Sequence, residues 1–184
     1  MGEFTTFKCS RPGSRLFRTE SILLRSHWVL VVLDQFTRRI VGFGVQAAAV
    51  DGPALCRMFN QAISGQGLPT RLSTDHDPLF QFHRWQANLR ILDLETVQTV
   101  PQVPWSHPFI ERLIGTIRRE YLDRLFFWTS DDLERKLELF KSFYNAARMH
   151  QGLSGDTPGE KAAGLENYRW QSHCHGLFEL PIAA

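Results

Sequence analysis

Residues 27–45 read HWVLVVLDQFTRRIVGFGV. Residues 27–33 form a nearly continuous apolar run with several β-branched side chains, which is typical of a strand buried on both faces. A short polar turn follows, and residues 39–45 form a second apolar segment. Two such segments joined by a short turn predict an antiparallel β-hairpin in the core.

The segments around this hairpin predict an α/β protein. Upstream, the apolar residues 16–17 and 22–24 predict a strand that enters the core. Downstream, Asp51 and Pro53 predict the N-cap and first turn of a helix that reaches Gly65. Its apolar residues recur at helical spacing: Leu55, Met58, Phe59, Ala62 and Ile63.

The remaining segments continue the alternation of strands and helices. The pattern predicts strands over residues 70–73 and 95–100, and helices over residues 80–92, from about Glu111, and from 131 to 150. Pro101 and Pro104 separate the last strand from the helix that Glu111 opens, and Ser130 is the expected cap of the last helix. This order predicts a mixed sheet covered by helices.

Length and composition indicate one ordinary globular domain. The chain has 184 residues, of which 43% are hydrophobic and 22% charged, enough to bury a core without disulfides. Three widely spaced cysteines favour reduced thiols, and no apolar run is long enough to span a bilayer, so we expect a cytoplasmic protein without a membrane partner. We expect an N-terminal extension or tag over residues 1–14, a core domain over 15–160 and a C-terminal tail over 161–184.

The basic residues are unevenly distributed. The net charge is only +2, but residues 1–39 carry seven basic and three acidic side chains. Arg118 and Arg119 form a second basic pair. Scattered solvated charges would give the same count, so charge alone does not decide between nucleic-acid binding and an ordinary surface.

Two acidic residues carry the strongest indication of chemistry. Asp75 follows the predicted strand 70–73, and Glu111 lies at the start of a predicted helix, with 35 residues between them. Carboxylates brought together from a strand end and a helix start can share divalent cations, which activate water in phosphodiester chemistry. Glu111 alone would also be explained as a first-turn carboxylate favoured by the helix dipole.

Four blocks of sequence, in this order and spacing, resemble the integrase core family of D,D-35-E transposases and retroviral-type integrases, in its bacterial insertion-sequence branch. The blocks are VVLDQFTRRIVG (residues 31–42), STDHDPLF (73–80), SHPFIERLIGTIRRE (106–120) and FYNAARMHQGL (143–153), the last followed by Thr157-Pro158. Together they cover about residues 28–160.

This resemblance implies an RNase H-like fold with a five-stranded mixed sheet. It implies DNA integration by metal-dependent phosphodiester cleavage and strand transfer, with Asp75 and Glu111 as catalytic metal ligands for two Mg²⁺ or Mn²⁺ ions. It also implies DNA as substrate, a homodimer or higher homo-oligomer, and action on bacterial chromosomal or plasmid DNA. Arg118 follows Glu111 by two helical turns, so it can contact DNA phosphates; Arg119 is the second candidate, though it points about 100° away.

The family's first acid is the missing part of the pattern. By analogy it lies eighteen or nineteen residues before Asp34, where this chain has Leu16 and Arg15. The better register puts Arg15 in that position, and Glu20 is too far along the strand to replace it. A guanidinium there would repel metal ions and could instead pair with Asp75 or Glu111. We therefore expect an impaired integrase core; the alternative is a non-catalytic DNA-binding or assembly module with the same fold.

Several other candidates have plainer explanations. Asp34 and Asp77 are expected in turns rather than as metal ligands, and His107 as a structural loop residue. The tail residues 173–175, His-Cys-His, are a weak zinc motif because no second cluster of ligands accompanies them. Trp85, Trp105 and Trp128 are expected to be packing residues rather than platforms for stacking on bases.

Overall fold

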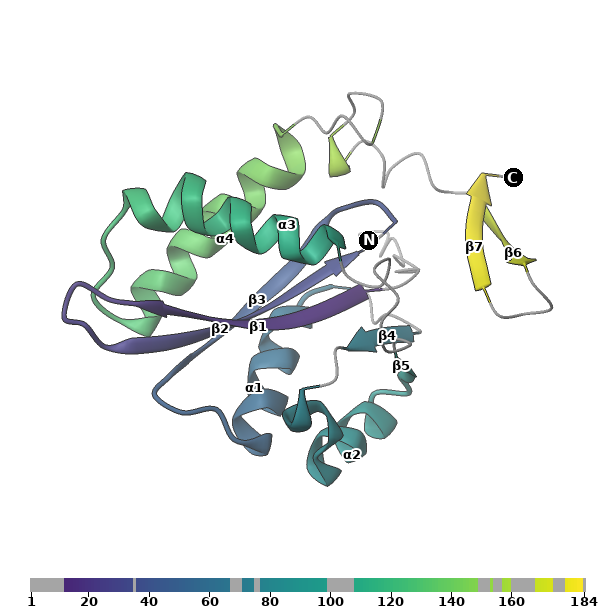
Figure 1. The fold of residues 1–184 in the computed structure, drawn as a ribbon, viewed down its shortest axis with the longest axis horizontal. Helices are drawn as coiled ribbons and strands as arrows, with labels where there is room; N and C mark the ends of the chain where they lie inside the picture. The colour runs from purple at the N-terminus through teal and green to yellow at the C-terminus, as the bar shows by residue number, and fades with distance from the viewer. Residues whose placement is uncertain are drawn as a thin grey trace, which may run out of the picture.

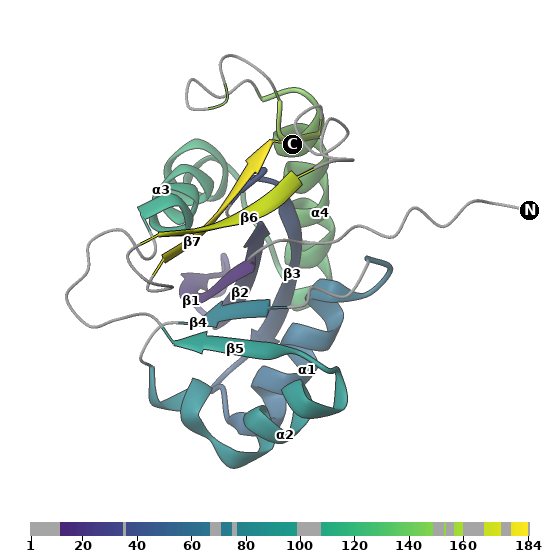
Figure 2. The ribbon, with the colours of Figure 1, turned by 90° about the vertical axis from the view of Figure 1, so that its right-hand side faces the viewer.

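The computed structural model of the chain describes residues 12–34, 36–66, 71–74, 77–98, 108–148, 153, 157–159, 168–173 and 178–183. Five strands form one sheet in the order β3-β2-β1-β4-β5. Helices lie on both sides of it (Figures 1 and 2). The predicted mixed sheet flanked by helices is therefore confirmed.

The first three strands form an antiparallel meander. β1 (Pro12–Glu20), β2 (Ser26–Asp34) and β3 (Ile40–Ala47) pair in sequence order. β2 is covered on both faces, as its apolar run predicts, and its residues from Val29 to Asp34 are all buried. The predicted hairpin is confirmed.

The other two strands extend the sheet in parallel from β1. β4 (Arg71–Thr74) pairs with β1, and β5 (Glu95–Gln98) pairs with β4. Parallel neighbours need helical crossovers, and α1 (Gly52–Ile63) and α2 (His83–Ile91) supply them.

The predicted cap of α1 is confirmed, whereas the predicted helix 80–92 is divided. The Asp51 side chain accepts a hydrogen bond from the backbone N–H of Ala54 at 2.7 Å. Before α2, a 3₁₀ turn occupies Pro78–Gln81. Asp77 caps that turn, accepting from the backbone N–H of Leu79 at 2.9 Å, as expected of a turn residue.

The second helical layer is formed late in the chain. α3 (Pro108–Thr116) continues through a π-helical turn, Ile117–Tyr121, and a 3₁₀ turn, Leu122–Arg124. α4 (Ser130–Ala146) then packs beside β3. Its cap is Thr129, whose hydroxyl accepts from Asp132 N–H, so the prediction of Ser130 as the cap is wrong by one residue.

Two apolar clusters lie on opposite faces of the sheet. On the α3 and α4 side the strands contribute Phe17, Val29, Val31, Leu33, Ile40, Phe43 and Val45. On the α1 and α2 side they contribute Leu30, Val32, Val41 and Leu72. The alternation along β2 follows from the two-residue period of a strand. Gly44 is required where β3 meets α1, because an added Cβ would lie 2.1 Å from the carbonyl oxygen of Met58.

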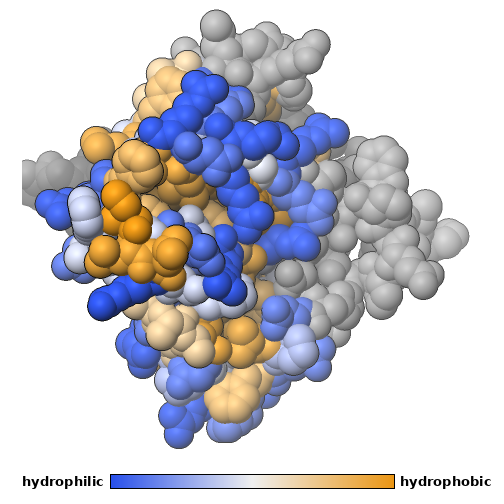
Figure 3. Space-filling view, turned by 60° about the vertical axis from the view of Figure 1, so that its left-hand side comes forward, coloured by the Kyte–Doolittle hydropathy of each residue, from blue (hydrophilic) through white to orange (hydrophobic). Residues whose placement is uncertain are grey.

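The prediction that residues 22–24 form part of a strand is wrong. β1 ends at Glu20, which pairs with Ser26, and the three apolar residues occupy the turn between β1 and β2. Their side chains are exposed, and Leu24 has a left-handed backbone with φ of 56°. An antiparallel hairpin must reverse here, and the reversal carries these residues out of the sheet. Figure 3 brings this end forward and shows apolar residues gathered there with hydrophilic residues around them.

The two ends of the chain also contain strands that the sequence did not indicate. β1 begins at Pro12, inside the predicted extension 1–14. β6 (Tyr168–His173) and β7 (Phe178–Ala183) form a separate two-stranded antiparallel hairpin in the predicted tail. Among the described residues, no helix is long and apolar enough to cross a membrane.

Candidate functional site

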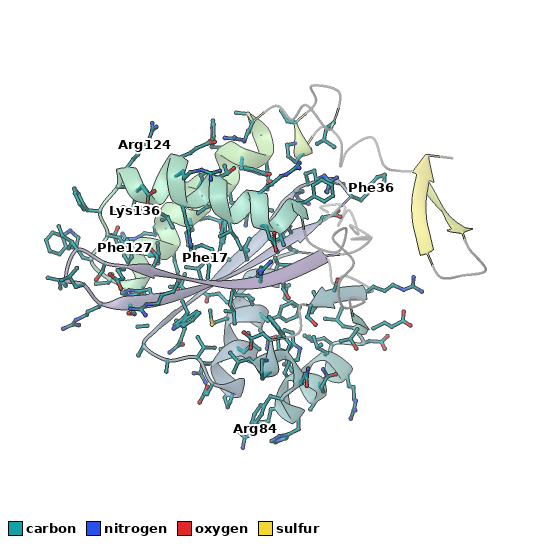
Figure 4. The ribbon with its side chains drawn as sticks, viewed as in Figure 1. Phe17, Phe36, Arg84, Arg124, Phe127 and Lys136 are labelled. Atoms are coloured by element: carbon teal, nitrogen blue, oxygen red, sulfur yellow. The ribbon has the colours of Figure 1, made fainter. Side chains whose placement is uncertain are left out.

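The candidate site lies where β1, the end of β4 and the first turns of α3 converge. Ser14 of β1 is paired with Thr74, the last residue of β4. Phe17 of β1 belongs to the apolar cluster beneath α3 and α4, and Figure 4 shows it between the strand and this helical layer. Arg15 lies two residues earlier on the same strand, so it shares this face.

Arg15 and Glu111 form an ion pair across this junction. The Arg15 guanidinium donates a hydrogen bond to the carboxylate of Glu111 in α3. The two side chains are 34% and 59% exposed, so the pair is only partly shielded from water. An exposed pair of this kind contributes about 0–1 kcal/mol to stability. One of the two pairings expected for Arg15 is therefore present.

Asp75 and its neighbour His76 lie outside the described residues. β4 ends at Thr74, one position before Asp75 in the sequence, and Thr74 is buried beside β1. His107 and Trp105, in the segment before α3, also lie outside the described residues. The geometry of this site thus rests on Arg15 and Glu111.

The described residues of this junction do not fit a paired-metal site. No group of three or more His, Cys, Asp or Glu side chains that could hold a metal occurs in the part of the chain that the structure describes. Glu111 faces a guanidinium, which occupies a carboxylate oxygen and carries the same sign of charge as a metal ion. Magnesium prefers several oxygen ligands, and a guanidinium has only donors to offer.

Arg118 is held against β1 rather than projecting freely. Its guanidinium donates to the backbone carbonyl of Arg18 at 3.2 Å and lies 5.4 Å from the centre of the Phe17 ring. Arg118 and Glu111 therefore both contact β1, Arg118 at Arg18 and Glu111 at Arg15. Arg119 is exposed, and its guanidinium lies over Gly115, one turn earlier. Contact of either arginine with DNA stays a prediction.

Asp34 is a turn residue, as expected. Its carboxylate accepts hydrogen bonds from the backbone N–H of Phe36 at 3.0 Å and from the Thr37 hydroxyl at 2.8 Å. Burial raises the pKa of Asp34, and these hydrogen bonds act in the opposite direction. The carboxylate is committed to closing the β2–β3 turn.

Arg38, in the same turn, fastens the start of α3, a role that sequence reasoning missed. Its guanidinium stacks on the ring of Phe109, two residues before Glu111. Burial lowers the pKa of Arg38 to about 10. Its backbone is left-handed, with φ of 64°. The only available signal was the place of Arg38 within the first motif, since its partner is 71 positions away in the sequence.

The fourth motif is structural, another role that sequence reasoning missed. The Asn145 side chain accepts from the backbone N–H of Ile40 and donates to its carbonyl, both at 2.9 Å. Tyr144 is buried beside it, and burial raises its pKa to about 12. Arg148 pairs with Glu120 through both guanidinium NH₂ groups, which lowers the pKa of Glu120. This motif fastens α4 to β3 and to the π-helical turn.

The structure describes two of the three tryptophans and one residue of the weak zinc motif. Trp85 is fully buried between Phe59 and Phe80, as expected. Trp128 is 57% exposed in the loop before α4, so it is not buried as Trp85 is, and its role stays a prediction. Of the weak zinc motif only His173, the last residue of β6, is described.

Comparison with known proteins finds sequences similar to this chain among insertion-element proteins. The family described as integrase core domain matches residues 92–158. An uncharacterized 39.2 kDa protein of insertion element IS476 from Xanthomonas euvesicatoria is 28% identical over 142 residues, which is 77% of this chain and 40% of that protein. The transposase for insertion sequence element IS904 of Lactococcus lactis is 28% identical over 71% of this chain and 53% of its own length. The chain thus spans about half the length of these relatives, or less.

Solved structures share the fold at low sequence identity. The HTLV-2 integrase catalytic core domain in complex with magnesium has a TM-score of 0.63 and 18% identity, covering 85% of this chain and 97% of that one. A chain of the simian T-cell lymphotropic virus intasome in complex with PP2A regulatory subunit B56 gamma has a TM-score of 0.68 and 14% identity, over 94% of this chain and 66% of that one. The predicted RNase H-like fold is confirmed.

Proposed function

We propose that this chain, which belongs to the integrase core family of transposases and retroviral-type integrases, is an insertion-element core whose DNA-cleaving chemistry is impaired by Arg15. In its active form such a core supports DNA integration by metal-dependent phosphodiester cleavage and strand transfer. The substrate we propose is bacterial chromosomal or plasmid DNA, in the cytoplasm. The active assembly is a homodimer or higher homo-oligomer.

The ion pair between Arg15 and Glu111 is the observation that carries this proposal. We assign Asp75 and Glu111 as the family's second and third acids, and Arg15 as the residue in the position of the first. Losing that carboxylate removes one anionic ligand, and the guanidinium in its place neutralises Glu111 and repels Mg²⁺ or Mn²⁺. The arginine therefore replaces the metal as the partner of Glu111.

The rest of the proposed site is retained. Arg118 is held on β1 by the Arg18 carbonyl and the Phe17 ring, beside the junction that contains Glu111. A cation fixed there suits a DNA phosphate, and Arg119 adds a second exposed cation one residue later. We expect DNA binding to depend on both arginines while cleavage is weak.

Nicking and strand transfer on end-labelled DNA, with Mg²⁺ or Mn²⁺, test the proposal. The unmodified chain should give no more product than a metal-free reaction, and Arg15→Asp should give clearly more. Arg18→Asp is the matched control, because it makes the same charge change on the same strand, also beside a glutamate, Glu20. Robust cleavage by the unmodified chain would refute the impairment. An Arg15→Asp variant no more active than Arg18→Asp would refute the assignment of Arg15 to the first-acid position.

A second candidate function is a non-catalytic DNA-binding or assembly module. It is favoured by the same ion pair, because Arg15 gives Glu111 a structural partner that needs no metal. DNA binding, measured by fluorescence anisotropy at two salt concentrations, is expected of both functions, so cleavage by Arg15→Asp is the result that discriminates them. A module predicts tight binding that Arg118→Ala weakens, together with no cleavage by Arg15→Asp; an impaired enzyme predicts that Arg15→Asp regains cleavage.

A further inference from the structure

The first turn of α3 rests on the sheet through three consecutive residues, Phe109, Ile110 and Glu111. Ile110 is 1% exposed and belongs to the apolar cluster beneath α3 and α4. Successive side chains of an α-helix are about 100° apart, so Phe109 and Glu111 lie on the two flanks of Ile110. An arginine contacts each flank: Arg38 stacks on the Phe109 ring, and Arg15 pairs with Glu111.

The two arginines approach α3 from different parts of the sheet. Arg15 is in β1, whereas Arg38 is in the turn between β2 and β3. The sheet order β3-β2-β1 places β1 and β3 on opposite sides of β2. This turn lies at the end of the sheet where β1 begins, because Asp34 pairs with Pro12. Figure 4 labels Phe36, from the same turn, at the end of the molecule where α3 begins.

The position of Arg38 costs free energy. Its backbone is left-handed, with φ of 64°, a conformation that glycine adopts more readily. Its Nη1 is buried and has no hydrogen-bond partner within the described part of the chain. Burial and the like charge of Arg112 lower the pKa of Arg38, and the fields of Tyr144 and Asp34 offset only part of this effect. Backbone strain and unsatisfied buried donors cluster at functional sites, where the surrounding structure maintains them.

The apolar contacts of α3 hold the helix on the sheet without fixing its rotation. Its buried face consists of Ile110, Leu113 and Ile114, and hydrophobic burial is non-directional. A planar guanidinium stacked on a ring has a defined geometry instead. A rotation of the helix that separated Phe109 from Arg38 would move Glu111 by the same angle. At a radius of about 5–6 Å from the helix axis, a rotation of about 10° displaces the Glu111 side chain by about 1 Å, enough to break a hydrogen bond.

We propose that Arg38 is a positioning residue for Glu111: by stacking on Phe109 it sets the rotation of α3 and thereby the place of the Glu111 carboxylate beside β1. The consequence for DNA chemistry rests on the proposed function, in which Glu111 is the third acid of the site. The positioning itself does not, because the same rotation decides whether Glu111 meets Arg15 in the unmodified chain.

Solution NMR of the full chain with ¹³C-labelled glutamate tests this proposal without metal or DNA. The side-chain carboxylate signal of Glu111, identified by its loss in Glu111→Gln, should shift in Arg15→Met because the ion pair is removed. Arg38→Ala should shift this signal by at least about half as much, since a displaced Glu111 loses the charge-assisted hydrogen bond from Arg15. In the Arg38→Ala background, Arg15→Met should add little.

Matched variants separate positioning from charge and from general loosening. Arg38→Lys keeps the charge but not the planar stack, so it should behave like Arg38→Ala. Arg39→Ala is the control in the same turn: the Arg39 guanidinium donates to Gln66 at 3.0 Å, so the Glu111 signal should stay in place. The Glu95 carboxylate, which pairs with Arg71, serves as an internal control and should be unchanged in every variant.

Several outcomes would overturn the proposal. An unchanged Glu111 signal in Arg38→Ala, or an equal shift in Arg39→Ala, would exclude a positioning role for Arg38. An equal shift of the Glu95 signal would show general loosening of the fold instead. If Arg15→Met itself caused no shift, the ion pair that Arg38 is proposed to position would be refuted. Failure of the proposed function is a separate result, because it appears as absent cleavage by Arg15→Asp while the NMR shifts remain.

Discussion

Two polar junctions fasten the α3–α4 layer to the sheet, and they differ in kind. At α4, Asn145 makes two hydrogen bonds to the backbone of Ile40, beside the buried Tyr144. At α3, Arg15 and Glu111 meet as a partly exposed ion pair. The first junction satisfies the backbone N–H and carbonyl of the buried residue Ile40, so the fold favours an amide side chain at position 145. The second contributes little to stability, so its residues can change without loss of the fold.

This contrast distinguishes a motif that maintains the fold, the segment around Asn145, from positions proposed to carry chemistry, Arg15 and Glu111. The fourth motif is intact because the fold needs it. Arg15, which we propose stands in the first-acid position, gives Glu111 a partner that the fold accepts.

Asn145→Ala should give the largest loss of stability. The change leaves both the N–H and the carbonyl of Ile40 without a partner, at a cost of about 2–4 kcal/mol. Urea denaturation followed by circular dichroism measures the free energy of unfolding. Ser142→Ala on the same helix is the control, since the Ser142 hydroxyl donates to the carbonyl of Glu138 at an exposed position, and we expect a change within about 0.5 kcal/mol. Equal effects of the two variants would contradict the structural role of Asn145.

Tyr144 should make the α4 junction sensitive to alkaline pH. Burial raises its pKa from 10 to about 12, so above pH 10 the unfolded chain loses this proton while the folded chain keeps it. Stability should therefore fall between about pH 10 and pH 12, by roughly 2–3 kcal/mol for two pH units, and then level off. Unfolding measured across this range should show a shallower loss for Tyr144→Phe. Identical pH profiles would mean that the tyrosine is not the group responsible.

Arg15→Met should have the smallest effect on stability. Because the pair with Glu111 is partly exposed, we expect a loss of about 0–1 kcal/mol, and less at high salt. Arg71→Met is the matched control: Arg71 pairs with Glu95 at 2.8 Å, at similar exposures of 32% and 66%. The two variants should behave alike in urea denaturation. A loss for Arg15→Met as large as that for Asn145→Ala would remove the distinction between the junctions.

The sequence predicted the parts of the molecule that depend on local patterns. The β2–β3 hairpin, the Asp51 cap and the apolar stripe of α1 follow from periodicity and turn chemistry. These are short-range rules, and the structure follows them. The pairing of Arg15 with Glu111, 96 positions apart, was expected only from the family resemblance, which left Asp75 as the other possible partner.

The parts that the sequence did not reveal depend on distant contacts or on a change of direction. Residues 22–24 have the composition of a strand, but the hairpin reverses there. The hydrogen bonds between Asn145 and Ile40 join positions 105 residues apart. Likewise, no local rule distinguishes the buried Trp85 from the exposed Trp128, because burial is decided by what packs over each ring.

The melting temperature of the chain with and without millimolar Mn²⁺ tests whether Arg15 keeps a metal ion away from Glu111. The unmodified chain should show no rise, because on our proposal the guanidinium of Arg15 pairs with Glu111 where a metal would bind. Arg15→Asp should melt lower without metal, since it sets two carboxylates together, and should regain stability when Mn²⁺ is added, with Arg18→Asp as the control that does not respond. A clear rise in the melting temperature of the unmodified chain would contradict the claim that Arg15 blocks the site.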